Sequence, residues 1–203
     1  MSSSTAHPGH AHDVAWPTDD QYGAATPGKI GMWIFLISDA FSFAGLLIGF
    51  AILRAGHPVW RQVGEPALGV NFTAALTLLL ICSSVTNVLG YAAAVEGKRR
   101  QAAALLGATG LLGAAFLLGQ YREYSGLIRE GLVFGHSARA SIFYVITSFH
   151  GLHVLTGVVY ILAVLVAYVR GRAGPRQIEL LGLFWCFVDF VWIFVFSSLY
   201  LIP

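Results

Sequence analysis

The chain has 203 residues, of which 57% are hydrophobic and 11% are charged, and it carries a formal net charge of +2. Soluble domains carry about 25% charged residues, so this composition, with a mean hydropathy of +0.71, indicates a chain that exposes most of its surface to lipid. The small net charge argues against a nucleic-acid partner. Cys82 and Cys186 both lie in apolar runs, which indicates neither a disulfide framework nor a zinc-type cluster.

Residues 1–28 are polar and contain three prolines together with several serine, glycine and threonine residues. This composition is typical of a flexible tail. The stretch "HPGHAHDVAWP" lacks the order of a basic and then an apolar region that marks a signal peptide. Residues 29–203 are expected to form a single domain.

Five apolar segments follow the tail, and each is long enough to cross a membrane. A helix rises about 1.5 Å per residue and the hydrocarbon core is about 30 Å thick, so roughly 20 residues are needed. The segments cover about residues 30–53, 70–95, 102–121, 140–169 and 178–202. The sequence therefore predicts an all-α polytopic membrane protein, a bundle of five transmembrane helices.

The distribution of lysine and arginine predicts the orientation of this bundle. Lys29, the run "GKRR" and the run "RGRAGPR" fall on one face and hold seven of the twelve basic side chains. The other face holds five, which are diluted by glutamates. Because basic residues collect on the cytoplasmic side, we expect the N-terminus in the cytoplasm and the C-terminus outside.

Four ionisable residues fall inside the apolar segments, near the middle of the membrane. They are Asp39 in the first segment, His150 and His153 in the fourth, and Asp189 in the fifth. A charged group at this depth costs at least about 2.5–3.5 kcal/mol on insertion scales, so such side chains normally face protein and find partners. We therefore expect an intramembrane polar cluster, with Asp39 within hydrogen-bonding reach of one of the two histidines.

Three roles are open to this cluster. A metal site needs three or four convergent ligands, which two histidines and two aspartates could supply only from distant segments. A proton relay needs a path to water, and the hydroxyl and amide groups of the other segments offer only a discontinuous one. The interpretation that we favour is a structural role, in which the four side chains make hydrogen bonds that hold neighbouring helices together.

Several motifs show a resemblance to a known family. In chain order they are "GMWIFLISDAFSF", "EGKRRQ", "LLGQYREY", "FHGLHVLTG" and "FVDFVWIFVF". With these motifs, the chain resembles subunit III of the haem–copper terminal oxidases, the cytochrome c oxidase and quinol oxidase family, from about residue 28 to residue 200. Its five segments are similar to the shorter bacterial form, which lacks the first two helices of the seven-helix form.

Two positions depart from the family pattern. Most members have glutamate where this chain has Asp39, and most have histidine where it has Cys186. The shorter aspartate must approach its partner more closely or through a water, and the cysteine removes a polar partner from the fifth segment. Glu123 and Glu179 match the other acidic positions of the family.

The resemblance implies a subunit without redox chemistry of its own in a proton-pumping oxidase of aerobic respiration. In that family the haems and copper are held by partner subunits: subunit I carries the haem–copper oxygen site, and subunit II carries the electron-donor contact. The chain is then expected to bind no metal, to pack mainly on subunit I in the bacterial plasma membrane, to hold phospholipid and to support proton uptake. A small extra subunit could supply the two missing helices.

Arg170 and Arg172, at the end of the fourth segment, are candidates for binding a lipid headgroup, because arginine makes charge-assisted contacts to phosphate. They could equally be ordinary basic residues of the cytoplasmic face. Two alternatives to the oxidase subunit also stay open: an equivalent subunit of a nitric oxide reductase or another respiratory complex, and an independent transporter. The sequence has no inverted repeat and no proline-broken helix, which argues against the transporter.

Overall fold

The structure is a computed structural model, and it describes residues 27–57, 60, 66 and 68–201. Its regular elements are all helical over this part of the chain: α1 (Pro27–Gly56), α2 (Val70–Val95), α3 (Arg99–Arg129), α4 (Ala138–Val169), α5 (Pro175–Phe196) and a short π-helix, η2 (Ser197–Leu201). Each of the five long helices is long and apolar enough to cross a membrane. The predicted five-helix membrane bundle is confirmed.

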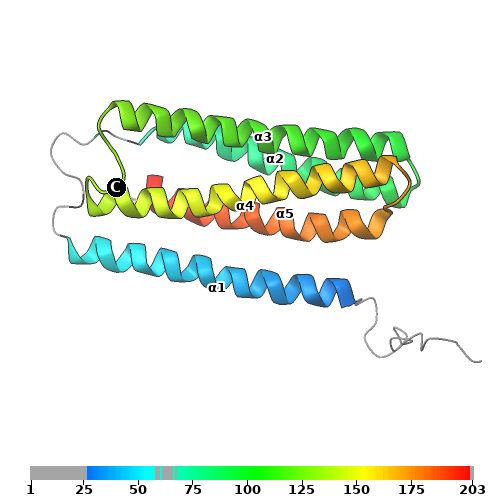
Figure 1. Ribbon diagram of the computed structural model, residues 1–203, viewed down its shortest axis with the longest axis horizontal. Helices are drawn as coiled ribbons and strands as arrows, with labels where there is room; N and C mark the ends of the chain where they lie inside the picture. The colour runs from blue at the N-terminus through cyan, green and yellow to red at the C-terminus, as the bar shows by residue number, and fades with distance from the viewer. Residues whose placement is uncertain (1–26, 58–59, 61–65, 67, 202–203) are drawn as a thin grey trace, which may run out of the picture.

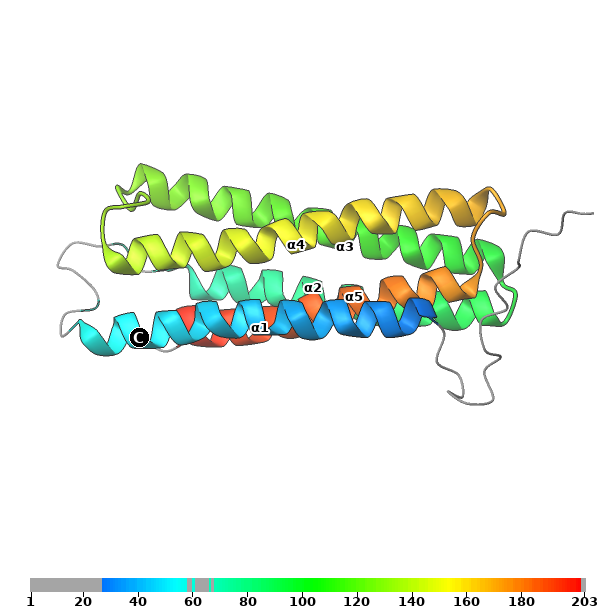
Figure 2. The ribbon, with the colours of Figure 1, turned by 60° about the horizontal axis from the view of Figure 1, so that its bottom comes forward.

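The helices α2 to α5 form a four-helix bundle, and α1 lies along one side of it (Figure 1). In the second view α1 runs in front of α5 (Figure 2), and its main contacts are with α5 and α4. The turns at residues 96–98 and 170–174 lie at the end of the bundle where α1 begins, which we call the Lys98 end. The connection between α3 and α4 lies at the opposite end, which we call the Gly131 end.

The two short turns at the Lys98 end share one backbone design. After α2, the N–H of Gly97 donates to the carbonyl of Ala94 and the N–H of Lys98 donates to the carbonyl of Ala93. Gly171 closes α4 with the same pair of bonds, and both glycines have a φ near +75°. This is the Schellman motif, in which glycine takes the left-handed conformation that reverses the chain after a helix. It makes α2–α3 and α4–α5 tight antiparallel pairs.

Several helix boundaries differ from the prediction, among them the end of α3 and the start of α5. The helix α3 continues to Arg129, although its apolar run ends near residue 121, and α5 begins at Pro175. Proline suits the first position of a helix because the N–H group that it lacks would have no intrahelical partner there. In the continuation of α3, Leu127 is buried in the core and Glu123 finds hydrogen-bond donors on other elements, as described below. The predicted tail lies outside the described residues up to residue 26, and Pro27 and Gly28 belong to α1.

The centre of the bundle is built around Trp185 of α5, which is 1% exposed. Its indole fits between two glycines of neighbouring helices, Gly113 on α3 and Gly157 on α4. A Cβ added at Gly113 would lie 2.6 Å from Trp185 Cη2, and one added at Gly157 would lie 2.6 Å from Cζ3. The indole Nε1–H donates to Ser83 Oγ on α2 at 2.9 Å. One side chain therefore joins four helices.

Candidate functional site

The first polar contact within the membrane joins α1 to α4. Asp39 Oδ1 lies 3.2 Å from His153 Nε2, and both side chains are largely buried. The other nitrogen of His153, Nδ1, lies 2.8 Å from the carbonyl oxygen of Phe149, one turn earlier on α4. Phe43 of α1 packs edge-on against the His153 ring, with 5.1 Å between ring centroids. The expected approach of Asp39 to a histidine is present, and the histidine is His153.

The hydrogen-bond geometry fixes how many protons this pair holds. A carbonyl oxygen only accepts, so Nδ1 of His153 must carry a proton and donate it to Phe149. The contact between Nε2 and Asp39 then needs one more proton, on the imidazole or on the carboxyl group. In either arrangement the pair is neutral overall, which removes the cost of an isolated charge in the membrane. Asp39 and His153 therefore share a single proton between α1 and α4.

His150 has a different environment, in the middle of the bundle. It is fully buried, and its Nε2–H donates to the carbonyl of Val188 on α5 at 3.2 Å. Its ring lies 4.6 Å from the ring of Trp192 and 5.8 Å from that of Phe116, measured between centroids. Among the described contacts, it bonds to neither aspartate. His150 thus holds α4 to α5 through the backbone.

Asp189 pairs with α2 rather than with a histidine. The hydroxyl of Ser84 donates to Asp189 Oδ2, and Oδ1 has no hydrogen-bond partner among the described residues. Cys186, one turn earlier on α5, is exposed on the same helix. The structure therefore brings together Asp39 and His153, and separately Asp189 and Ser84. The four predicted residues do not form one hydrogen-bonded network in the described part of the chain.

Glu123, which matches an acidic position of the family, connects three elements near the Gly131 end. Its Oε1 accepts a hydrogen bond from Thr73 Oγ1 of α2 at 3.0 Å, and its Oε2 accepts one from Tyr200 Oη of η2 at 3.0 Å. A carboxylate that accepts two hydroxyl donors is well satisfied in a half-buried position. This contact fixes the π-helix at the end of the chain against α2 and α3. The sequence marks Glu123 by its match to the family but indicates neither of these partners.

Glu179, the other family-matching acid, lies near the Lys98 end. Its Oε1 is 2.6 Å from Lys29 Nζ, so an ion pair joins α5 to the start of α1. Together with the contact of Asp39 and His153, it attaches α1 to both α5 and α4 through polar side chains. Both contacts involve acidic residues that the sequence marks, Asp39 and Glu179, but the sequence does not predict that Glu179 pairs with Lys29.

The candidate lipid ligands, Arg170 and Arg172, are exposed at the same end of the bundle. Arg170 caps the C-terminus of α4. The nearby Arg99 is engaged differently: its guanidinium donates to the carbonyl of Tyr168 at 2.9 Å and lies 5.6 Å from the centre of that ring. Arg170 and Arg172 are therefore placed where a headgroup at the membrane surface could reach them.

The part of the chain that the structure describes contains no cluster of possible metal ligands. No group of three or more histidine, cysteine, aspartate or glutamate side chains there is arranged to hold an ion. The polar groups form pairs between helices, and what such pairs can do is to fix helix positions and share protons.

Comparison with known proteins identifies the family. The sequence model described as cytochrome c oxidase subunit III matches residues 20–202. Subunit 3 of the cytochrome bo(3) ubiquinol oxidase of Pseudomonas aeruginosa is 34% identical over 201 residues, 96% of this chain and 94% of that protein.

Two proteins named cytochrome c oxidase subunit 3 are similarly related. The one from Corynebacterium diphtheriae is 35% identical, over 86% of this chain and 87% of its own. The one from Synechocystis is 34% identical, over 98% of this chain and 83% of its own. The match covers nearly the whole chain, at identities that establish common descent. The chain belongs to the cytochrome c oxidase subunit III family.

Proposed function

We propose that this chain is the non-redox subunit III of a proton-pumping terminal oxidase in a bacterial plasma membrane, packed mainly on subunit I and also associated with subunit II. Its family makes it an accessory subunit of a haem–copper oxidase. The observation that carries the proposal is the match over residues 20–202. Because the related proteins are named as oxidase subunits, the comparison favours an oxidase over a nitric oxide reductase.

The polar contacts support a role in maintaining structure and proton balance. The neutral pair of Asp39 and His153 keeps a transferable proton inside the membrane without an isolated charge. It also holds α1 in place on the bundle. We propose that the pair supports proton uptake by the partner subunits that carry haem and copper, and that α1 presents an apolar surface to them.

The basic side chains support a lipid role and an orientation. Arg170 and Arg172 are exposed at the Lys98 end, which also carries Lys98, Arg99 and Arg100. This end is proposed to face the cytoplasm, because basic residues concentrate there. A phospholipid headgroup held by Arg170 or Arg172, with its acyl chains along the helices, would cover apolar surface where the seven-helix members have two more helices. A neighbouring subunit would supply the remaining wall.

Co-purification tests the proposal directly. The chain, tagged and isolated from its native membrane in a mild detergent, should bring down two larger subunits together with haem and copper. The pigment should show the absorption spectrum of an oxidase and consume oxygen. Isolation of the chain alone, or with a complex that reduces nitric oxide and not oxygen, would contradict the proposed assignment.

A further inference from the structure

The end of α5 and the π-helix that follows it form a continuous set of ring contacts inside the bundle. Trp192 and Tyr200 lie 6.5 Å apart between ring centroids, and Phe196 stacks on Tyr200 at 5.5 Å. On its inner side, Trp192 lies 4.6 Å from the ring of His150. Trp192 is 2% exposed and Tyr200 is 7% exposed. Because the two rings nearly touch, an electron can pass between them within the protein.

Indole and phenol rings respond differently to the loss of one electron. An oxidised indole can keep its N–H proton and remain a cation, whereas an oxidised phenol is a strong acid and must lose its proton. A buried tyrosine is therefore readily oxidised only where a base lies within hydrogen-bonding reach, about 2.6–3.2 Å, and accepts this proton. The hydrogen-bond partner of each ring decides where the oxidised state of the core is most stable.

Tyr200 is the buried ring that donates to a carboxylate, among the hydrogen bonds that the described residues make. Its Oη–H donates to Glu123 Oε2 at 3.0 Å. Trp192 Nε1–H instead donates to a threonine hydroxyl of α2 at 2.9 Å. Tyr144 Oη–H donates to the backbone carbonyl of Leu132 at 2.7 Å. A hydroxyl group and an amide carbonyl are very weak bases, so the proton of Trp192 or Tyr144 has no place to go.

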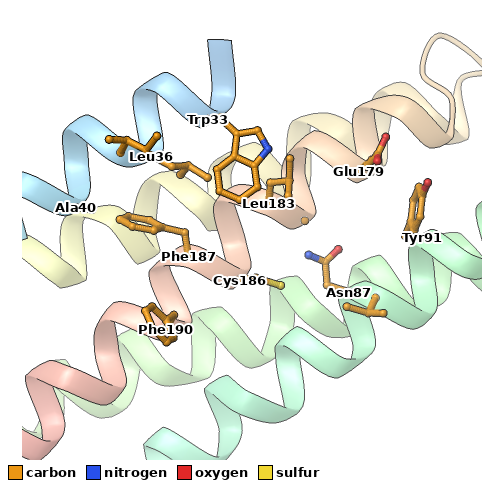
Figure 3. A pocket seen from close by; sticks show the side chains of 13 residues that line it. Trp33, Leu36, Ala40, Asn87, Tyr91, Glu179, Leu183, Cys186, Phe187 and Phe190 are labelled. Carbon is orange, nitrogen blue, oxygen red and sulfur yellow. The ribbon is translucent and has the colours of Figure 1, made fainter. Parts of the chain in front are cut away.

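A second tyrosine and a second glutamate line the cavity of about 550 Å³ between α1, α2 and α5 (Figure 3). They are Tyr91 of α2 and Glu179 of α5. No hydrogen bond joins them in the described part of the chain, and Glu179 is paired with Lys29 at 2.6 Å. Tyr91 therefore has a carboxyl group in the same cavity but lacks the hydrogen-bonded base that Tyr200 has.

Glu123 is held in position for a proton from Tyr200. The hydroxyl of Thr73, which is fully buried on α2, lies 3.0 Å from Glu123 Oε1. The two carboxylate oxygens thus face different donors, Oε1 on the side of α2 and Oε2 on the side of η2. A proton that leaves Tyr200 is received on Oε2 without a change in the contact to α2.

We propose that Tyr200 is the site at which one-electron oxidation of the aromatic core comes to rest, with Glu123 as the acceptor of its proton. Tyr200 gives one electron to oxidised Trp192 and its phenolic proton to Glu123 Oε2. Trp192 returns to its neutral form, Tyr200 becomes a neutral radical, and Glu123 becomes a neutral carboxylic acid. The indole cation and the carboxylate lose their charges together, which is favourable for buried groups. The radical is thereby held at the Gly131 end, away from the middle of the bundle.

The oxidant that removes the first electron from Trp192 comes from outside the chain. It belongs to the class of one-electron oxidants that can oxidise an indole, and hydroxyl radical, a product of incomplete oxygen reduction, is a member of this class. The inference goes beyond the proposed function, because the step needs only residues of this chain.

Flash photolysis of the full-length chain in phospholipid vesicles, without other subunits, tests the proposal. The oxidant is a ruthenium trisbipyridyl complex with an alkyl tail, which partitions into the lipid and is oxidised by a flash in the presence of methyl viologen. Transient absorption and electron paramagnetic resonance distinguish indole radicals from tyrosyl radicals. In the wild type, the indole radical should decay as the tyrosyl radical forms. In Tyr200→Phe most of the tyrosyl signal should be lost and the indole radical should persist.

A matched control and a second variant separate this chemistry from packing. Tyr144→Phe removes a phenol of similar burial, 8% exposed, whose proton faces a carbonyl, and the tyrosyl signal should not change. Glu123→Gln keeps an oxygen that accepts from Tyr200 but cannot take up its proton. Tyrosyl formation in Glu123→Gln should slow by at least about a hundredfold, the lower limit of the contribution of a positioned base.

Two results would overturn the proposal: a tyrosyl signal in Tyr200→Phe as large as in the wild type, and tyrosyl formation in Glu123→Gln as fast as in the wild type. The second measurement decides the question by itself if Tyr200→Phe does not fold, because Glu123→Gln retains the hydrogen bond. These measurements involve no haem and no partner subunit. Their failure would leave the proposed oxidase function intact, and failure of that function would leave the tyrosyl measurements unchanged.

Discussion

Replacing Gly157 by alanine should destabilise the bundle through a single methyl group. The new Cβ would lie 2.6 Å from Trp185 Cζ3, 2.7 Å from Cε3 and 3.3 Å from Phe184 Cε1. Real Cβ atoms do not approach other atoms so closely, so the indole would have to move. It cannot move away from α4 without meeting α3, where Gly113 already lies against the other edge of the ring. Movement along the helix would break the bond from Nε1 to Ser83.

The size of the effect follows from these contacts. Extra carbon atoms in a well-packed core cost about 1–3 kcal/mol. Loss of the bond between Trp185 and Ser83 would add about 0.5–1.5 kcal/mol. Alanine regains at most about 1 kcal/mol over glycine as a helix former. The free energy of unfolding of Gly157→Ala should therefore fall by about 1–3 kcal/mol.

Unfolding of the purified complex in a titration with sodium dodecyl sulfate, followed by tryptophan fluorescence, measures this loss. The matched control is Gly45→Ala on α1, where an added Cβ meets nothing within 4 Å; its stability should be unchanged or slightly higher. Combining Gly157→Ala with Trp185→Phe should cost less than the sum of the single changes, because the smaller ring relieves the clash. If Gly157→Ala proves as stable as Gly45→Ala, the close packing of Trp185 against α4 is refuted.

Three further predictions concern the polar contacts. Asp39→Leu and His153→Leu should each lower the free energy of unfolding by about 1–3 kcal/mol, because each leaves one buried partner unpaired; the double variant should cost less than the two losses added, and simple additivity in double-mutant unfolding curves would contradict the contact. Tyr200→Phe should lower the free energy of unfolding by about 0.5–1.5 kcal/mol, because its hydrogen bond to Glu123 is lost. The C-terminal end of the chain should then be cleaved more readily in limited proteolysis. In a variant that already carries Glu123→Leu, Tyr200→Phe should have no further effect on the free energy of unfolding. Lys29→Met should cost less than about 1 kcal/mol, since the ion pair is partly exposed, and raising the salt concentration should remove the difference from wild type; an effect that persists in high salt would argue for a packing role.

The five spans can be predicted from the sequence because a bilayer permits few backbone structures. Inside a bilayer every backbone polar group needs an internal partner, so a long apolar run such as residues 140–169 must be helical. The full length of α3 could not be predicted from its apolar run, which ends before the helix does. Residues 122–129 carry three charged side chains and a glycine and resemble a connecting loop, but in the helix Leu127 is buried in the core and Glu123 accepts hydrogen bonds from hydroxyl groups of α2 and η2. Those donors are distant in sequence.

The polar contacts were predictable in kind and only partly in detail. The cost of Asp39 in the membrane required a partner, and the histidines at similar depth were the natural candidates. Which histidine it meets depends on how α4 is rotated, and the packing of His150 against Trp192 and Phe116 sets that rotation. Asp189 bonds to Ser84 because α2 and α5 are neighbours, an order of helices that hydropathy does not encode.

The position of α1 beside the bundle has a consequence for biosynthesis. The partner of Asp39 lies on α4, 114 residues later in the chain. At a synthesis rate of about 5–20 residues per second, roughly 6 to 23 s pass before His153 leaves the ribosome. The pairs α2–α3 and α4–α5 can enter the membrane as hairpins, closed by their own short turns. The first helix has no such companion, so it waits with an unpaired carboxyl group in its middle until the last hairpin arrives.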